Sequence, residues 1–243
     1  MDEPAIDRYT AAARVAALDW ARIADDLDAF GAATAGPVLT DDECAGLRAA
    51  YGDGGLFRSR VVMSRHGFGR GDYQYFAYPL PDLIAALRTA FYRRLAPIAN
   101  RWQALAGCYT RYPPAHGTYL ARCRAAGQSR PTPLLLRYGP GDYNCLHQDL
   151  YGGEHFPLQV AILLSGPGTD FAGGEFVLTE QRPRAQSRAE FVPLGRGEAV
   201  IFAVDQRPVQ GSRRIHHVRM RHGVSRIRRG ERYTLGLILH DAS

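Results

Sequence analysis

From Pro133 onward, the sequence is a succession of short segments typical of β-strands, separated by turns that contain glycine or proline. The segments cover residues 134–138, 156–165, 174–178, 189–194, 198–202, 222–227 and 233–240. Short strands at this regular spacing favour an antiparallel fold of two facing sheets, because that fold protects the strand edges. We therefore expect a jelly-roll core, in which side chains from different strands can meet at one open end.

The first third of the chain has a helical pattern instead. Apolar residues recur at helical spacing from Tyr9 to Phe30, where a glycine-bounded break follows. Thr40 and Glu43 form a capping box that begins a second helix, which we expect to end near residue 51. A third and longer helix is expected from about Leu83 to Leu105.

Length and pattern together predict one structural unit of the α+β class. A chain of 243 residues can bury about 70–75% of its unfolded surface, enough for one sizeable core. We expect residues 133–243 to form the β core. Residues 1–132, with a strand at 57–63, should form an extension whose helices pack on one sheet.

Two motifs in the strand-rich part contain candidate metal ligands. His147-Gln148-Asp149 is a His-x-Asp pair, and about one such pair is expected by chance in a chain with eight histidines. The second motif, from His222 to Thr234, is far more specific, because its spacing of Val, Ile, Gly, Arg and Thr should arise on the order of once in a thousand chains. Two imidazoles and one carboxylate form the facial triad that holds non-haem Fe(II).

The spacing of the second motif predicts two strands joined by a glycine turn. His222 would begin one strand, the chain would turn at Gly230, and Arg232 and Thr234 would return on one face of the next strand. An arginine at this position could grip a carboxylate with two hydrogen bonds. His216 and Arg226 form a rival pair at the same spacing, but no glycine turn separates them.

These residues resemble the motif of the iron(II)/2-oxoglutarate-dependent dioxygenases. The resemblance implies a double-stranded β-helix core of the cupin-like type, and Fe(II), 2-oxoglutarate and O2 as cofactor and co-substrates. His147, Asp149 and His222 would hold the metal, and Arg232, Thr234 and Tyr138 would bind 2-oxoglutarate. As a whole, the chain looks like a bacterial oxygenase family that is proposed to act on alkylated or damaged DNA.

Two positions depart from branches of this superfamily. Tyr138-Gly139-Pro140-Gly141 is similar to a Tyr-x-x-Gly stretch of the prolyl-hydroxylase branch, but Asn144 stands where that branch has an aromatic residue. The AlkB-type dealkylases carry a second arginine six residues beyond the first, where this chain has Ile238. The first departure argues against a prolyl residue of a protein as the substrate. The second removes one argument for the repair of nucleobases.

Apolar side chains from the strand interiors should wall the reaction site and exclude water. The candidates are Leu146, Val160, Ile162, Phe202 and Leu237.

Charge is concentrated near the second motif. All 30 basic side chains are arginine, and 13 of them lie between Arg182 and Arg232 against four acidic residues, a local balance of +9 within a total of +6. An anionic substrate or partner is one explanation, because clustered charge attracts opposite charge. A solvated arginine face without a partner is the other.

The loop from residue 65 to residue 75 suggests single-stranded or damaged nucleic acid as the partner. It combines Arg65 and Arg70 with Phe68, Tyr73 and Tyr75, residue types that hold phosphates and stack on bases. The same aromatics could instead pack into the domain. The preferred function is therefore oxidative dealkylation of nucleic acid in DNA repair. The alternatives are a small-molecule or protein side-chain hydroxylase, and a non-enzymatic cupin-like metal sensor.

The remaining features indicate the compartment. No stretch of eighteen residues is apolar and uncharged, and the N-terminus lacks the order of a signal peptide. The four cysteines show no C-x-x-C spacing, which suggests reduced thiols. We expect a cytoplasmic protein that does not contact a membrane, and the sequence suggests no obligate protein partner.

Overall fold

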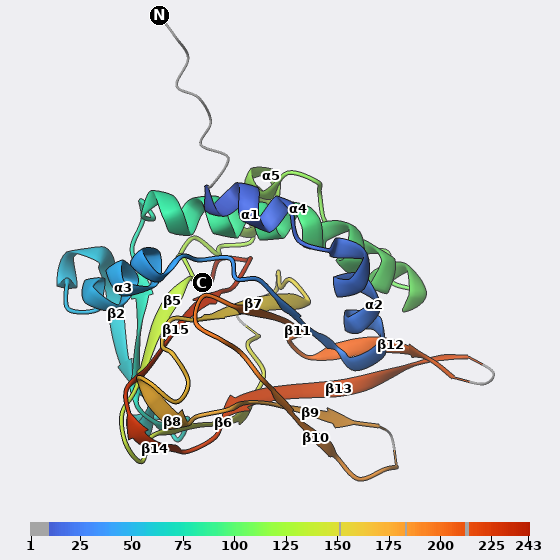
Figure 1. The fold of residues 1–243 in the computed structure, drawn as a ribbon. Helices are drawn as coiled ribbons and strands as arrows, with labels where there is room; N and C mark the ends of the chain where they lie inside the picture. Colours follow the sequence, from blue (N-terminus) through green and yellow to red (C-terminus); the bar gives the residue numbers. More distant parts are fainter. Residues whose placement is uncertain (1–9, 151, 183, 212–213) are drawn as a thin grey trace, which may run out of the picture.

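The structure is a computed structural model that describes residues 10–150, 152–182, 184–211 and 214–243 (Figure 1). Its α-helices are α1 (Ala11–Ala16), α2 (Trp20–Phe30), α3 (Asp41–Ala50), α4 (Asp82–Leu105) and α5 (His116–Ala125). Its N-terminal strands are β1 (Ala32–Ala35), β2 (Phe57–Val62), β3 (Gly69–Arg70) and β4 (Asp72–Phe76), with 3-10 turns at Gly54–Leu56 and Met63–Arg65. The later strands are β5 (Leu134–Tyr138), β6 (Tyr143–His147), β7 (Leu158–Leu163), β8 (Phe171–Gly173), β9 (Phe176–Gln181), β10 (Arg188–Val192), β11 (Ala199–Ala203), β12 (Gln206–Gln210), β13 (Ile215–Val224), β14 (Ile227–Gly230) and β15 (Arg232–Leu237).

Side-chain caps fix where the helices begin and end. The predicted capping box of α3 is present, with the Thr40 hydroxyl accepting from the Glu43 amide and the Glu43 carboxylate accepting from the Thr40 amide. The single helix predicted up to Phe30 is wrong, because the chain breaks between α1 and α2 and Asp19 caps a new helix start. Its predicted first residue, Tyr9, lies outside the described residues.

Two antiparallel sheets dominate the fold. The seven-stranded sheet has the order β1-β11-β7-β15-β5-β4-β2, so strands from the first third of the chain extend both of its edges. The six-stranded sheet has the order β10-β9-β13-β6-β3, and β12 pairs with the first half of β13. A short pair of strands, β14 and β8, lies at one end. The fold is therefore α+β with antiparallel sheets.

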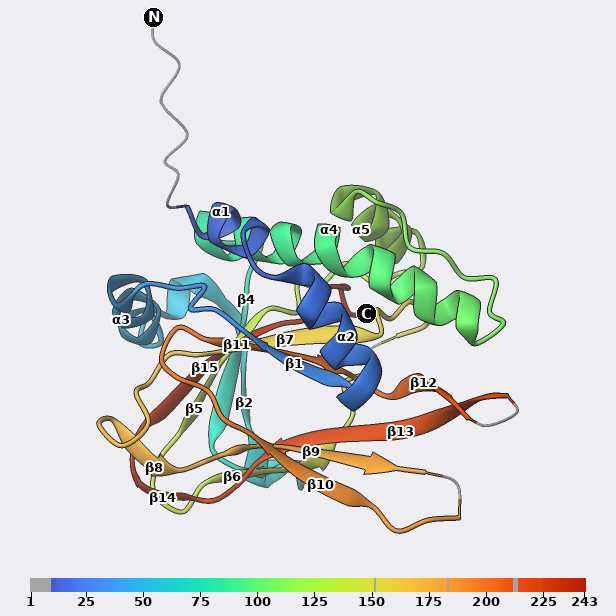
Figure 2. The ribbon, with the colours of Figure 1, turned by 45° about the vertical axis from the view of Figure 1, so that its right-hand side comes forward.

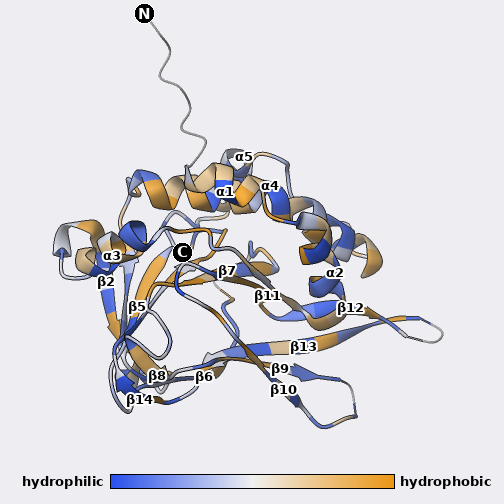
Figure 3. Ribbon diagram, in the orientation of Figure 1, coloured by the Kyte–Doolittle hydropathy of each residue, from blue (hydrophilic) through white to orange (hydrophobic). Residues whose placement is uncertain are grey.

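The helices lie on one side of the seven-stranded sheet, and the six-stranded sheet lies on the other (Figures 1 and 2). Helix α4 buries Phe91, Tyr92 and Leu95 in a core that also contains Val160 and Ile162 of β7. Figure 3 shows β5 as hydrophobic along much of its length. No helix in the described ranges is both long enough and apolar enough to cross a membrane.

Strand β7 lies within the predicted segment 156–165, and its burial does not alternate along the chain. All six residues of β7 are buried, because one face of this strand meets the helices and the other faces the second sheet. A strand covered on both sides reads as a continuous apolar run rather than as an alternating one.

The predicted hairpin after His222 is also wrong, because the two strands that it would join lie in different sheets. His222 lies near the end of β13 rather than at its start, and β13 belongs to the six-stranded sheet. Arg232 and Thr234 lie on β15, in the seven-stranded sheet. The segment with Gly230 therefore crosses from one sheet to the other, and the two halves of the motif face each other.

The crossing needs glycine at residue 230. Gly230 has a φ of +74°, and a Cβ atom there would lie 2.0 Å from the carbonyl oxygen of Asp170. Any other residue would be strained by the backbone and would clash with the neighbouring chain. The turn at Gly230 leads the chain from β14 into β15.

Candidate metal centre and the pocket around it

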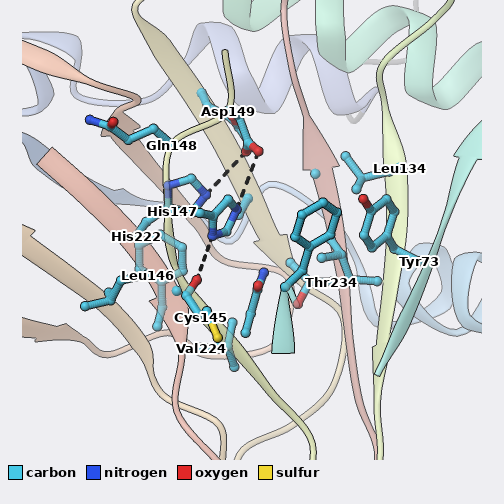
Figure 4. Close-up of a pocket in the computed structure, with 18 of the residues that line it drawn as sticks. Tyr73, Leu134, Cys145, Leu146, His147, Gln148, Asp149, His222, Val224 and Thr234 are labelled. Atoms are coloured by element: carbon cyan, nitrogen blue, oxygen red, sulfur yellow. Dashed lines mark hydrogen bonds and ion pairs between the residues drawn. The ribbon is translucent and has the colours of Figure 1, made fainter. Parts of the chain in front are cut away.

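The structure brings His147, Asp149 and His222 together. His147 ends β6 and pairs directly with His222 of β13, while Asp149 follows β6 by two residues. Nε2 of His222 lies 3.3 Å from Oδ2 of Asp149, and Nε2 of His147 lies 3.5 Å from Oδ1. One ligand atom from each side chain lies within 4.8 Å of the others, so these three groups could hold one metal ion (Figure 4).

Neighbouring groups orient both imidazole rings. Nδ1 of His147 donates to the carbonyl of Cys145 at 2.8 Å, which fixes the ring with Nε2 on the side of Asp149. The ring of His222 packs 4.6 Å from the ring of Phe202 and stacks on Phe176 at 6.0 Å. Hydrogen bonding therefore holds one histidine, and aromatic packing holds the other.

The pKa shifts of Asp149 and His222 suit a metal site. Burial alone would raise the pKa of Asp149, but hydrogen bonds and charge from His147 and His222 hold that pKa well below its usual value. Burial lowers the pKa of His222, and the neighbouring His147 lowers it further. Burial opposes the charged form of His147, but Asp149 raises its pKa above the ordinary value. An ionised carboxylate and a neutral imidazole are the forms that bind metal.

Gln148, between the two ligands of the His-x-Asp pair, ties this loop to the rest of the site. Its amide nitrogen donates to the carboxylate of Asp205 and, at 2.8 Å, to the carbonyl of Met220, two residues before His222. The segment that carries His147 and Asp149 is thereby fixed to the strand that carries the third group.

The three groups open into a pocket of about 310 Å³ between the two sheets. Arg232 and Thr234 line the opposite wall, together with Tyr138. Figure 4 shows Thr234 and Tyr73 across the pocket from the two histidines and Asp149. The pocket is the place where both predicted motifs meet.

Arg232 is a buried cation with few partners. It is 2% exposed, its Nη1 donates to the Thr234 hydroxyl, and its Nε has no hydrogen-bond partner. No ion pair in the described part of the chain involves it, although the Glu175 charge acts on it from a distance. Burial lowers the pKa of Arg232 to about 10. A buried guanidinium without a carboxylate is costly unless a ligand supplies the anion.

A glycine turn makes room for the stem of Arg232. Gly174 has a φ of +66°, and a Cβ atom there would lie 2.9 Å from Cδ of Arg232 and 2.2 Å from Cδ1 of Ile227. Tyr138 and Phe171 flank the guanidinium, with ring centroids 5.8 and 5.9 Å from its central carbon. The Gly-Gly turn and the aromatic rings therefore aim Arg232 along the pocket.

Only some of the apolar residues that were predicted to wall the reaction site line the pocket. Leu146 and Phe202 line the pocket, but Val160, Ile162 and Leu237 do not and instead pack in the core that includes α4. Their neighbours line the pocket, because consecutive residues of a strand point to opposite faces. These neighbours are Gln159, Ala161, Gly236 and Ile238.

The candidate substrate residues occupy different places. Tyr73 lines the pocket, whereas Tyr75 is buried next to it with ring centroids 5.4 Å apart. Arg65 and Arg70 are exposed, and Arg70 lies 3.9 Å from Asp142. Arg65, Arg70 and Tyr75 are not among the residues that line the pocket.

Phe68, an aromatic residue of the same predicted loop, lies at the pocket. It is 47% exposed, lines the pocket and stacks on His66 at 5.3 Å.

Some arginines of the arginine-rich stretch between Arg182 and Arg232 form ion pairs within the protein. Arg196 pairs with Asp170 at 3.1 Å, and the buried Arg207 pairs with Glu180 at 2.5 Å. Arg219 and Arg221 are exposed on β13, on the face opposite to His222. These four arginines therefore do not face the pocket.

The donor set and the pocket fit Fe(II) and 2-oxoglutarate. Two imidazoles and one carboxylate leave coordination positions open on iron. The unpartnered Nε of Arg232 is a place for a second carboxylate in the same pocket. The rival His216 is six residues from His222 on β13 and does not line the pocket, and its partner Arg226 is exposed.

Residues 71–242 match the sequence profile of a family described as "oxygenase, catalysing oxidative methylation of damaged DNA". Two uncharacterized proteins of Mycobacterium tuberculosis, from strains CDC 1551 and H37Rv, are similar to the chain. Each is 51% identical to it over 168 residues, which cover 69% of this chain and 72% of the relative.

Solved structures show the same fold at low sequence identity. A prolyl-4-hydroxylase of Pseudomonas putida is 17% identical, with a TM-score of 0.52 over 89% of this chain and 96% of that one. An oxidoreductase of the 2OG-Fe(II) oxygenase family from Burkholderia pseudomallei is 17% identical, with a TM-score of 0.53 over 92% of each chain. These similarities concern the fold alone.

Proposed function

This chain belongs to the family of oxygenases described as catalysing oxidative methylation of damaged DNA, and we propose that it oxidises an alkyl carbon bonded to a nitrogen of a damaged nucleobase. It is an oxidoreductase of the iron(II)/2-oxoglutarate-dependent dioxygenases, with Fe(II), 2-oxoglutarate and O2 as cofactor and co-substrates. Membership of an oxygenase family favours an enzyme over the metal-binding sensor that the sequence also allowed.

One observation supports the site assignment most strongly. The histidine and carboxylate cluster and the unpaired, buried Arg232 line the same pocket. We assign His147, Asp149 and His222 to iron, and Arg232 to the far carboxylate of 2-oxoglutarate. When bound, iron, 2-oxoglutarate and O2 would supply the oxidation of a substrate C–H bond to C–OH, with succinate and carbon dioxide as the other products.

The chain's own residues prepare this reaction in three ways. Cys145 and Asp149 keep His147 oriented through its two ring nitrogens. Thr234 holds one nitrogen of Arg232, and Nε remains able to donate to a carboxylate. Apolar walls, which include Phe176, exclude water from the reacting carbon.

We further propose that the two facing sheets form a double-stranded β-helix. Successive strands alternate between the sheets: β5, β7 and β11 lie in one, and β6 and β9 lie in the other. In this proposal residues 133–243 form the catalytic core and residues 1–132 an extension that adds edge strands and helices. The unit would act in the cytoplasm, on single-stranded or damaged DNA.

An alkylated nucleobase is the substrate that fits the family description. Phe68 at the pocket and Tyr73 inside it offer aromatic surfaces for an unstacked base, and the exposed Arg65 and Arg70 lie on the same loop. Hydroxylation of an N-methyl carbon produces an unstable N–CH2OH group, which releases formaldehyde and restores the N–H of the base.

Succinate formation tests this function. A methylated single-stranded oligonucleotide should stimulate conversion of 2-oxoglutarate to succinate and release formaldehyde, whereas the same unmethylated oligonucleotide should not. Binding should weaken with salt, with a log–log slope of about −0.7 per phosphate contact. Salt-independent binding without stimulated turnover would contradict the proposal and favour a small-molecule or protein hydroxylase.

A further inference from the structure

Gln159 is the one polar residue of strand β7. It is the second residue of β7, whose other members are Leu158, Val160, Ala161, Ile162 and Leu163. It is only 6% exposed, and its side chain lines the pocket. Its carbonyl oxygen, Oε1, is buried and has no hydrogen-bond partner among the residues that the structure describes. A buried amide oxygen without a partner requires an explanation, because such groups are nearly always satisfied.

The sheet register places Gln159 at the opposite end of the pocket from Arg232. Thr234 pairs with Leu163, Gly236 pairs with Ala161, and Gln159 lies one further two-residue step beyond that pair. Arg232 lies one such step on the other side of Thr234, so three steps, about 20 Å along the strand direction, separate the two backbones. Arg232 and Gln159 therefore lie at the two ends of this wall.

Gln159 is also on the side of His222. It pairs across the sheet with Phe202, and both side chains line the pocket. The ring of Phe202 lies 4.6 Å from the ring of His222. An amide here can meet a molecule that approaches the candidate metal ligands.

2-Oxoglutarate does not account for this amide. When both of its carboxylates are ionised, 2-oxoglutarate carries only acceptor oxygens and cannot donate a hydrogen bond to Oε1. The acceptor at Gln159 is therefore left for a donor group of the substrate.

We propose that Gln159 determines substrate specificity, and that its Oε1 accepts a hydrogen bond from the exocyclic amino group of an N-methylated adenine or cytosine. The inference rests on the proposed function and specifies its substrate class. A side-chain amide is complementary to the polar edge of a base, and a pocket that hydrogen-bonds its substrate rejects analogues without the matching donor. A base that presents only carbonyl oxygens on that edge, such as 3-methylthymine, leaves Oε1 unpaired.

The test compares three single-stranded oligonucleotides that differ at one base: 1-methyladenine, 3-methylcytosine or 3-methylthymine. The wild-type protein should turn over the two amino-bearing bases with a kcat/KM at least about tenfold above that for 3-methylthymine. Gln159→Leu should lower kcat/KM for the amino-bearing bases by about tenfold and abolish the preference. Binding of 2-oxoglutarate to this variant should be unchanged. Gln159→Glu, which keeps an acceptor, should retain the preference.

A second measurement requires no substrate. Because Gln159→Leu removes an unpaired buried polar group, it should raise the melting temperature of the protein by about 2–4 °C. Gln210→Leu is the matched control, because Gln210 is exposed on β12 and should change neither stability nor preference. A lower melting temperature in Gln159→Leu would show that the amide is bonded within the protein and would overturn the inference.

The outcomes separate this inference from the proposed function. If methylated oligonucleotides stimulate turnover but Gln159→Leu keeps the full preference, the role of Gln159 is refuted and the function stands. If no methylated oligonucleotide stimulates the wild-type protein, the proposed function fails and the assignment of Gln159 to a base fails with it.

Discussion

The two sides of the seven-stranded sheet each contain a buried arginine, and their surroundings differ sharply. On the helix side, Arg88 of α4 pairs with Asp241 at 2.8 Å and donates to Thr132 and to main-chain carbonyls. On the pocket side, Arg232 of β15 donates to Thr234 and leaves Nε without a partner. Both side chains are at most 2% exposed, so burial does not explain the difference.

The comparison separates a structural charge from a binding charge. The network around Arg88 connects α4 to the end of the chain after β15, and its carboxylate comes from the protein itself. Among the described residues, the surroundings of Arg232 supply a hydroxyl and aromatic faces but no carboxylate in contact. A buried charge left in this state is explained by a ligand that carries the missing anion.

The largest effect should come from the candidate metal ligands. His147→Ala, Asp149→Ala and His222→Ala should each abolish iron-dependent succinate formation, because a site with two of three ligands does not keep iron in place. Their melting temperatures should stay close to that of the wild type, since these groups belong to the pocket side. His216→Ala should retain activity. Retention in the His222 variant with loss in the His216 variant would reverse the assignment.

Stability should separate the two arginines directly. Arg88→Met leaves the buried Asp241 carboxylate without its ion pair and should lower the free energy of unfolding by about 3–5 kcal/mol. Arg232→Met leaves no paired acid behind and should leave the free energy of unfolding unchanged or raise it. Denaturant unfolding measures both. Equal losses in the two variants would mean that Arg232 is a structural charge as well.

Substitution of Arg232 should weaken the binding of 2-oxoglutarate, although it should not lower the stability of the protein. Arg232→Lys should weaken 2-oxoglutarate binding by about 2–5 kcal/mol, because lysine keeps the charge but loses the planar two-point contact. Iron binding should be nearly unaffected, and titration calorimetry under anaerobic conditions can measure each ligand separately. Arg226→Lys is the matched control on the exposed rival position. An unchanged affinity in Arg232→Lys would remove the arginine from the site.

The smallest effect concerns pH and the helix side. Burial, with the charge of Arg88, lowers the pKa values of His116 and His240 to about 3. The unfolded chain therefore binds more protons between pH 6.5 and pH 3, so stability falls as the pH drops through that window. Each histidine should contribute at most about 2 kcal/mol between pH 7 and pH 5. His116→Phe should reduce this slope, and an unchanged slope would contradict the buried neutral state.

The candidate ligands could be predicted because their spacing is short-range. The pair of His147 and Asp149 is local, and the distance from His222 to Arg232 is set by one turn at Gly230. Sequence did not reveal that this turn passes between sheets, because strand pairing is a long-range property. The capping box at Thr40 was predictable for the same reason of locality, whereas the break before Asp19 was hidden by a continuous apolar pattern.

The pocket walls show the limit most clearly. In a strand buried on both sides, alternation does not tell which face meets the helices, so Val160 and Ile162 were assigned to the wrong face. A shift of one residue exchanges the two faces and places Gln159 in the pocket. The sequence does show a polar residue within the apolar run of β7. Only the structure shows that this residue faces the pocket.

The central claim is that His147, Asp149 and His222 bind iron while Arg232 anchors 2-oxoglutarate on the same metal. The most direct measurement is the visible absorption of the anaerobic protein with Fe(II) and 2-oxoglutarate. The account predicts a weak metal-to-ligand charge-transfer band in the wild type, its loss in His222→Ala, and a higher 2-oxoglutarate concentration to form it in Arg232→Lys. Absence of the band in the wild-type protein would contradict the account.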